Sequence, residues 1–440
     1  MKKIISIGEI NKSLLYIFLM SVSSVLNKYI YGFTYIECFY PMNIYRTLHN
    51  SILGGDSECR RHRVFDPFFS YIGIIFISFI FLREKIEQEE EEDLNKEKID
   101  QKEKPNSNLA VKLIYNKRKS YLKNVYGILF YILILFLWVA EENLLLIYVD
   151  IIQDLDFWFF ELIFVSLIFS KYFLTKILSH QKFGMAIGII IGSILKIFSI
   201  SVTLTSGTDV FYNKYKWLIS FVIIYFLLII LRSYVNTQIK IFFDLKYISQ
   251  RILLASYGLA GFIILGLTGI FTSNVPCSEE LRKYVCNFNS IDNTALYYDN
   301  FSVYYESGKN MAVRLIVIVL GMITFFFDKY YSTLIIKLYS PVHVIFSFPV
   351  QFFLEKTFLL IFTAIFFNDN LFKEEGQVKK FLMDESGDII SIIGFLIYLE
   401  IIELHFCKLD FNLSNNITFR ANEEIKEIKE LDSFIQEIED

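Results

Sequence analysis

Two acids and an amide near residue 140 are the side chains in this sequence that point most directly to chemistry. Glu141, Glu142 and Asn143 lie within LWVAEENLLL, inside a run that is otherwise apolar over residues 125–149. A charged group inside a membrane helix costs about 3 kcal/mol or more, so such residues usually face a water-filled cavity or a partner. We therefore expect these side chains to lie beside a central cavity. An alternative stays open, in which the helix ends near Ala140 and the acids reach the outer headgroups.

The composition of the chain is typical of a membrane protein. Of its 440 residues 54% are hydrophobic, more than the about 45–50% of ordinary soluble domains. Apolar runs recur that can cross a hydrocarbon core of about 30 Å as helices, whose backbone groups are satisfied internally. These runs lie at residues 13–31, 66–82, 124–149, 157–175, 181–205, 216–236, 252–273, 311–330, 341–367 and 387–406. The sequence therefore predicts an all-α membrane protein with about ten transmembrane helices.

The predicted spans divide the chain into two halves of five helices each. Residues 1–210 hold the first five and residues 211–406 the second five, which many transporters arrange as an inverted repeat. The charged run within 83–123 predicts a disordered cytoplasmic linker, and residues 407–440 form an acidic tail. With a cytoplasmic N-terminus, the inner segments hold 26 Lys and Arg against 13 in the outer segments. This asymmetry follows the positive-inside rule, so we expect both termini in the cytoplasm.

The long loop 274–310, which this topology places outside, carries two features of an oxidising compartment. Cys277 and Cys286 flank a short polar segment and are candidates for a disulfide, although two free thiols are an equal alternative. Asn300-Phe301-Ser302 is an acceptor pattern for N-glycosylation.

Further charged residues fall inside the expected spans. Glu161 and Glu400 are flanked by aromatic and aliphatic residues, and Lys356 lies within the ninth span. Each has an alternative interpretation as a member of a buried pair or as a snorkelling side chain. We include all three among the candidate residues of a polar pathway.

Three glycines recur every four residues in the fifth expected span. Gly184, Gly188 and Gly192 lie on one helix face, a pattern that permits close backbone contact with a neighbouring helix. We assign these glycines to helix packing and not to a binding site.

Several short motifs follow one another along residues 13–406. They are Asn27-Lys28-Tyr29, Asp66-Pro67-Phe68, the set Asn143, Leu146 and Tyr148, the set Phe173-Leu174, Lys176, Gln181 and Gly184, and Ser340-Pro341-Val342. In their order and spacing these motifs resemble the drug/metabolite transporter superfamily, and within it the eukaryotic branch of triose-phosphate and nucleotide-sugar carriers.

The resemblance implies a carrier that moves a small polar metabolite, such as a nucleotide sugar, by alternating access. We assign the substrate pathway to Asn27, Lys28, Glu141, Glu142, Asn143, Glu161, Gln351, Lys356 and Glu400. The chain departs from the sugar-phosphate carriers at one point. Those carriers place a phosphate-binding cation about ten residues after the ninth-span proline, where Gln351 stands here. An anionic, phosphorylated substrate is therefore in doubt.

The remaining expectations follow from the same resemblance. The partners would be membrane lipids and a small-molecule substrate, and a homodimer stays open. We expect an integral protein of the Golgi, the ER or another endomembrane rather than of the plasma membrane. No cofactor and no catalysis are expected, because His343 has no acid–base partner or metal pattern beside it. The alternative function is that of a non-transporting scaffold or receptor that keeps the carrier fold.

Overall fold

The computed structural model describes nine stretches of the chain. They are residues 7–34, 67–80, 124–151, 158–173, 178–192, 194–195, 218–272, 311–367 and 375–405. The linker 83–123, the loop 274–310 with Cys277, Cys286 and Asn300, and the tail from residue 406 lie outside these residues, as does the side chain of Lys28.

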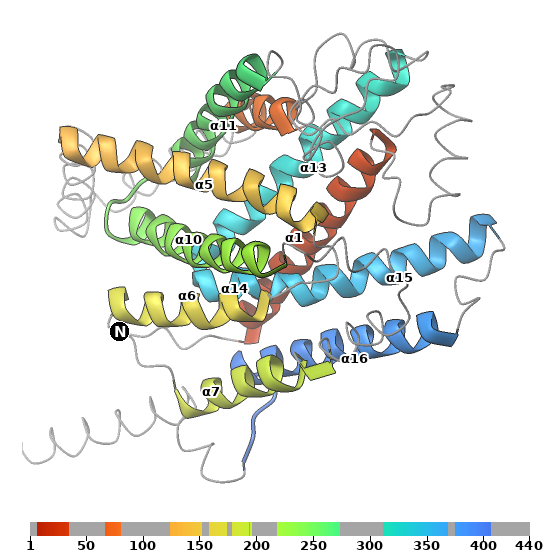
Figure 1. The fold of residues 1–440 in the computed structure, drawn as a ribbon. Helices are drawn as coiled ribbons and strands as arrows, with labels where there is room; N and C mark the ends of the chain where they lie inside the picture. Colours follow the sequence, from red (N-terminus) through yellow and green to blue (C-terminus); the bar gives the residue numbers. More distant parts are fainter. Residues whose placement is uncertain are drawn as a thin grey trace, which may run out of the picture.

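The described residues form helices and turns without a strand (Figure 1). In chain order the helices are α1 (Ile7–Thr34), an unlabelled helix (Pro67–Ile80), α5 (Val125–Ile151), α6 (Trp158–Phe173), α7 (Ser179–Ala186), the π-helix η1 (Ile187–Ile191), α10 (Leu218–Asp244), α11 (Gln250–Thr272), α13 (Met311–Leu338), α14 (Pro341–Ile345), α15 (Ser347–Phe367) and α16 (Glu375–Tyr398). Four of the described helices, α5, α10, α11 and α13, contain stretches long and apolar enough to cross a membrane. The expected all-α membrane class is confirmed at this level.

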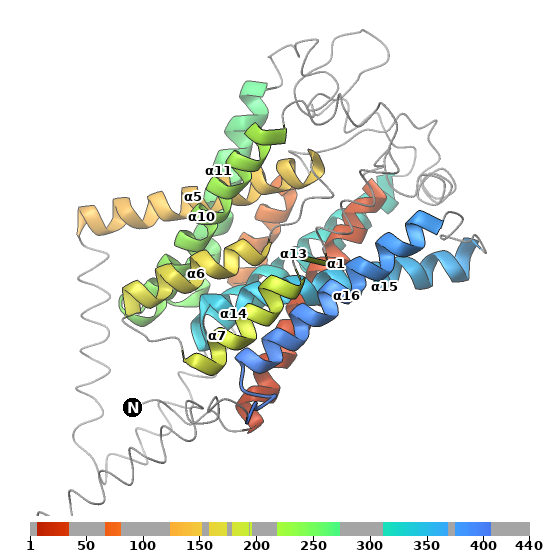
Figure 2. The same cartoon turned by 60° about the horizontal axis from the view of Figure 1, so that its bottom comes forward.

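The helices pack in a pattern that is repeated between the elements before and after residue 210. In the first part α1 packs mainly against α13 and α15, and in the second part α10 packs against α5 and α6. Counted along the chain, with α14 and α15 taken as one interrupted span, α1 and α10 are the first helices of the two parts, α5 and α13 are third, and α6 and α14–α15 are fourth. The first helix of each part therefore packs against the third and fourth helices of the other part. Figure 2 shows α1 running along α13, and α6 beside α10.

The second and fifth helices of each part complete this pattern by packing against each other. Tyr71 of the Pro67–Ile80 helix lies against α11, where its ring would meet a Cβ atom added at Gly261. Phe68 stacks on Phe262 with ring centroids 5.0 Å apart. At the other end, α7 and η1 lie side by side with α16 in both views (Figures 1 and 2).

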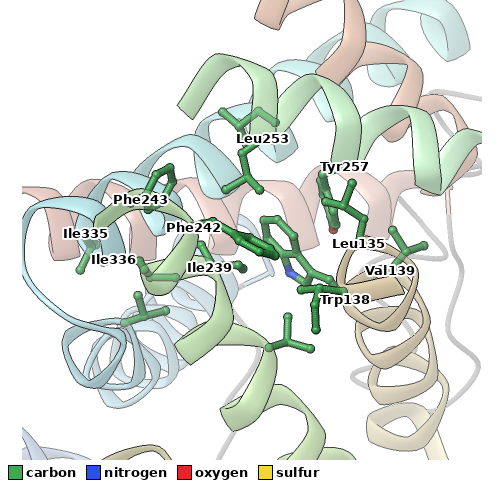
Figure 3. Packing of buried hydrophobic residues seen from close by; sticks show 14 of the residues in the cluster. Leu135, Trp138, Val139, Ile239, Phe242, Phe243, Leu253, Tyr257, Ile335 and Ile336 are labelled. Atoms are coloured by element: carbon green, nitrogen blue, oxygen red, sulfur yellow. The ribbon is translucent and has the colours of Figure 1, made fainter. Parts of the chain in front are cut away.

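The core between α5, α10, α11 and α13 is filled by large apolar side chains (Figure 3). Trp138 of α5 lies over Tyr257 of α11 with ring centroids 4.0 Å apart. Phe242 of α10 and Ile335 of α13 are fully buried in the same cluster. This layer holds α5 against the helices of the second part and fixes the direction in which the next residues of α5 point.

Two helices run further than their apolar runs predict. The spans expected over 216–236 and 311–330 are the longer helices α10 and α13, which end at Asp244 and Leu338. The added turns carry polar groups that face inward. Buried Thr237 in the added part of α10 and buried Thr333 in that of α13 donate hydrogen bonds to the carbonyls of Ser233 and Lys329 at 2.9 and 2.8 Å. Because these groups are satisfied inside the helix bundle, the helix continues where hydropathy alone places its end.

The ninth expected span, 341–367, is broken into α14 and α15. Pro349 has no N–H to donate to the carbonyl of Ile345 four residues earlier, so the helical ladder is interrupted there. Ser347 bridges the break, since its hydroxyl donates to the carbonyl of Val344 at 2.6 Å. The result is a short buried helix that turns the chain before α15 begins.

The tenth expected span, 387–406, is shifted toward the N-terminus, because α16 covers Glu375–Tyr398. Glu400 lies past its end with a left-handed φ of 61°. The Glu400 N–H donates to the carbonyl of Ile397 and the Ile401 N–H to that of Leu396, both at 3.0 Å. This hydrogen-bond pattern is the Schellman motif that commonly ends helices. Glu400 therefore occupies a capping position and not the middle of a span.

The glycines of α7 and η1 lie against α16. A Cβ atom added at Gly184 would stand 2.6 Å from both the carbonyl oxygen of Gly394 and the nitrogen of Tyr398. Gly188 and Gly192 face Ser391 on the same helix. Because the obstructing atoms at Gly184 are backbone, no side-chain rotation can make room for a larger residue.

This contact predicts that Gly184→Ala destabilises the protein. Overpacking of this kind costs about 1–3 kcal/mol, so the unfolding temperature in detergent micelles should fall. The matched control is Gly266→Ala in α11, where the added Cβ would lie 3.6 Å from Phe68, an ordinary contact. Equal unfolding temperatures for the two variants would contradict the close crossing of α7 and α16.

The cap of α16 predicts the opposite effect at Glu400. A left-handed conformation costs an ordinary residue about 1–2 kcal/mol that glycine avoids, so Glu400→Gly should raise the unfolding temperature. Glu403→Gly, at an exposed position three residues later, serves as the control and should not. A loss of stability in Glu400→Gly would show that its carboxylate, and not its backbone, matters to the fold.

Candidate functional site

The two acids of α5 point to two different cations. Glu141 Oε1 lies 3.2 Å from Nε of Arg232 on α10. Arg232 also reaches back to the N-terminal part of the chain, where its Nη1 lies 3.5 Å from Oε2 of Glu161 on α6. One guanidinium therefore joins three helices through two carboxylates.

Glu142, the next residue, lies about 100° further round the helix and has other partners. Its carboxylate pairs with the ammonium of Lys329 on α13 and accepts a hydrogen bond from the hydroxyl of Tyr257 on α11. Lys329 is shared, because its Nζ also lies 3.1 Å from Oδ2 of Asp328. We refer to Glu141, Glu142, Glu161, Arg232, Asp328 and Lys329 as the buried charge network.

Tyrosines and an amide surround the Glu142 side of the network. The hydroxyls of Tyr257 and Tyr71 lie 3.1 Å apart. Asn143 Nδ2 donates to the Tyr71 hydroxyl at 3.2 Å and to the carbonyl of Val139 at 2.7 Å. The third residue of the Glu-Glu-Asn triplet thereby links α5 to the Pro67–Ile80 helix.

The network lies inside the helix bundle. Glu141 and Glu161 are 1% and 2% exposed, and Arg232 and Lys329 stand near the middle of the candidate spans Ile223–Asp244 and Ile318–Leu338. The Arg232 side chain keeps 29% of its surface exposed, so this side of the network is not fully closed off. Charges held here are stabilised by one another and by hydrogen bonds, since bulk water is largely excluded.

Two other predicted pathway residues lie together at α1, apart from the charge network. The Oδ1 of Asn27 accepts a hydrogen bond from Thr324 of α13 at 3.2 Å. Gln351 of α15 accepts one from Ser24 of α1 at 3.2 Å and donates one to Ser347 at 3.1 Å. These contacts tie α1 to α13 and α15 with neutral groups.

The last two predicted residues occupy separate places. Lys356 of α15 lies 3.0 Å from Asp388 and 3.9 Å from Glu385, both on α16. Glu400 caps α16, as described above. The structure thus brings four of the predicted residues, Glu141, Glu142, Asn143 and Glu161, into one polar assembly. It distributes Asn27, Gln351, Lys356 and Glu400 over three further positions, and the side chain of Lys28 lies outside the described residues.

Sequence reasoning missed both cations of the network and Asp328. Lys329 and Asp328 fall at the edge of the apolar run 311–330, and only the extension of α13 to Leu338 makes them central. A signal was nevertheless present, since Asp328 follows the first residue of α13 by the same interval as Glu142 follows that of α5. The corresponding helices of the two parts therefore each carry a charged pair at the same level.

This arrangement can bind a charged group and can exchange one ion-pair partner for another. Each cation is shared by two carboxylates, so displacement of an ammonium or guanidinium would leave a paired acceptor for another cation. No group of three or more potential metal ligands occurs among the described residues. The contacts within the network are charge-assisted hydrogen bonds and ion pairs, which are suited to binding and to switching between partners.

The network predicts that Lys329→Met is strongly destabilising. Removing one member of a buried pair leaves uncompensated charge and costs about 3–5 kcal/mol, which should appear in unfolding experiments in micelles. Adding Glu142→Gln to Lys329→Met should recover part of this loss, because one of the stranded carboxylates is removed. Lys337→Met, at an exposed position on the same helix, is the control. Additive effects of the two substitutions would contradict the pairing.

Comparison with models of protein families gives no match for this chain, and comparison with curated proteins gives none either. The resemblance to the drug/metabolite transporters therefore stays a hypothesis based on the short motifs. A function for this chain has to be argued from the geometry of the buried charge network.

Proposed function

We propose that this chain is a multi-pass membrane carrier that moves a small polar metabolite by alternating access. The observation that carries the proposal is the position of the buried charge network. Glu141, Glu142 and Glu161 belong to helices before residue 210, and each is paired with a cation from a helix after it. The charges therefore converge on the interface between the two parts of the chain.

Convergence at this interface favours transport because of what such charges cost. A buried ion pair seldom stabilises a fold more than well-packed apolar residues of similar size would. Ionisable groups within membrane helices are accordingly rare and are usually functional. In carriers built from two repeats, the substrate site lies between the repeats near the bilayer midplane. Arg232 and Lys329 lie at the corresponding depth of their own helices.

The exchange of neighbours between the two parts supports a carrier with an internal repeat. The correspondence of α1, α5 and α6 with α10, α13 and α15 is the packing expected of two related five-helix units. An odd number of spans in each unit would give the units opposite orientations in the membrane, and hence ten transmembrane helices in an inverted repeat. This architecture agrees with the family resemblance, which would place the carrier in an endomembrane such as the Golgi or the ER.

The competing function is that of a non-transporting scaffold or receptor. One observation favours it, since the acids and cations are already paired with each other at close range. In a scaffold these pairs would stay intact throughout the life of the protein. In a carrier these pairs must exchange partners when the interface opens. Removing the charge of one acid should therefore lower transport by a carrier, whereas a scaffold has no transport to lose.

Transport by purified protein in vesicles tests the proposal. A panel of labelled nucleotide sugars, sugar phosphates, amino acids and amines is presented to proteoliposomes and to protein-free vesicles. At least one solute should enter only with the protein. Glu141→Gln and Glu142→Gln keep the side-chain volume and remove the charge, and loss of such a charge-assisted contact should lower uptake by about tenfold or more.

The matched control is Glu403→Gln, which removes an exposed carboxylate outside the network. It should transport as the unaltered protein does. Normal uptake by both Glu141→Gln and Glu142→Gln, or uptake of no solute in the panel, would favour the scaffold.

A further inference from the structure

We propose that the buried charge network selects a cationic solute, a small amine or guanidine, which its carboxylates bind between the two parts of the chain. The inference rests on the proposed function, because it names the class of solute that the carrier moves. Three features of the network support it, namely its charge balance, an acceptor that is left open and the aromatic faces around its cations.

The first feature is the excess of acids. Among the described residues the network holds four carboxyl groups, those of Glu141, Glu142, Glu161 and Asp328, and two cations. Net negative charge in a weakly polarisable interior is costly, and an added cation lowers this cost whereas an added anion raises it. The electrostatics of the network therefore discriminate by the sign of the solute charge.

The second feature is an unsatisfied oxygen. Glu141 Oε1 is fully buried and 3.2 Å from Nε of Arg232, yet it accepts no hydrogen bond from any described group. Buried carboxylate oxygens are almost always hydrogen-bonded, and an exception needs a reason. An ammonium or guanidinium N–H from a solute would satisfy this oxygen. The partial exposure of the neighbouring Arg232 side chain shows that this side of the network is not sealed.

The third feature is that the protein already holds two cations in the way that the proposal requires. The guanidinium of Arg232 lies between two carboxylates and 4.8 Å from the ring centre of Phe348. The ammonium of Lys329 also lies between two carboxylates, and it is 5.1 Å from the ring centre of Phe325. Acids combined with aromatic faces are a common means of binding organic cations. Arg232 and Lys329 thus show, within the chain, the chemistry that a solute cation would use when it replaces one of them.

The positions outside the network agree with this assignment. Among the described side chains at α1, the polar contacts to α13 and α15 include those of neutral Asn27, Ser24 and Gln351, and none of these three provides a positive charge for a phosphate. In the described contacts between the two parts, Arg232 and Lys329 each form ion pairs with two carboxylates. An anionic solute would have to compete with two acids for either cation, whereas a cationic solute competes with one cation for two acids.

The test uses matched probes that differ in charge but little in shape. L-Arginine and L-citrulline have nearly the same size, one with a guanidinium and one with a neutral urea group, and putrescine and 1,4-butanediol form a second pair. Binding to the purified protein is measured as the shift of its unfolding temperature, and uptake is measured in proteoliposomes. We expect a cationic member to bind and to be taken up at least about tenfold better than its neutral counterpart. Glu141→Gln should abolish this preference, and Glu403→Gln should leave it unchanged.

The outcomes separate this inference from the proposed function. Uptake of a nucleotide sugar, a sugar phosphate or a neutral probe in preference to the cations would overturn the cationic class while a carrier remained. Accumulation of a neutral probe driven by an imposed pH gradient would do the same, since the bound cation would then be a proton. If no solute of any charge is taken up, the proposed function itself fails.

Discussion

The need to pair charge inside an apolar helix bundle is the constraint on which this structure depends. Glu141 and Glu142 are neighbours on α5, and the helical turn between them sends one toward Arg232 and the other toward Lys329. Each cation then recruits a second acid, from α6 or from α13 itself. Because neither acid can be left alone at this depth, α5 has a fixed rotation about its axis and fixed neighbours. The apolar layer formed by Trp138 and Tyr257 packs consistently with that rotation.

The polar interior and the apolar exterior of the bundle have different roles. Apolar side chains cover the outer face of α5, where Leu129, Leu133 and Phe136 are exposed, and this surface suits contact with lipid tails. Lipid supplies little hydrophobic drive for one helix to associate with another, so specificity must come from close packing and from polar contacts. The crossing of α7 with α16 uses the first means, and the buried charge network uses the second.

The sequence predicted the class of the fold and singled out three of the four acids of the buried charge network, and missed what depends on long-range packing. Hydropathy located helix in each expected span, but it ended α13 before Lys329 was central, because inward-facing polar residues lower hydropathy without ending a helix. Glu400 was misplaced for a local reason, since a left-handed cap is commonly glycine and an acid gives no such signal. The cations that complete the site lie on α10 and α13, far along the chain from α5. No pattern within α5 identifies them, because pairing across the bundle is set by tertiary contact and not by periodicity.

The two parts of the chain are alike in packing but unlike in charge, and this difference gives the network its chemistry. At the same level of the corresponding helices, α5 carries Glu142 and α13 carries Asp328, but each acid has a different neighbour, namely Glu141 on α5 and Lys329 on α13. A strictly repeated sequence would place two acids on both helices and leave the second pair without a cation of its own. Because Lys329 stands in the second part, α13 attracts α5 through the pair of Lys329 with Glu142. The network as described still contains more acids than cations. A movement that separated α5 from α10 and α13 would strand carboxylates in a medium that solvates them poorly, unless water or another cation took the place of Arg232 or Lys329. The same contacts that hold the helices together therefore determine what can part them.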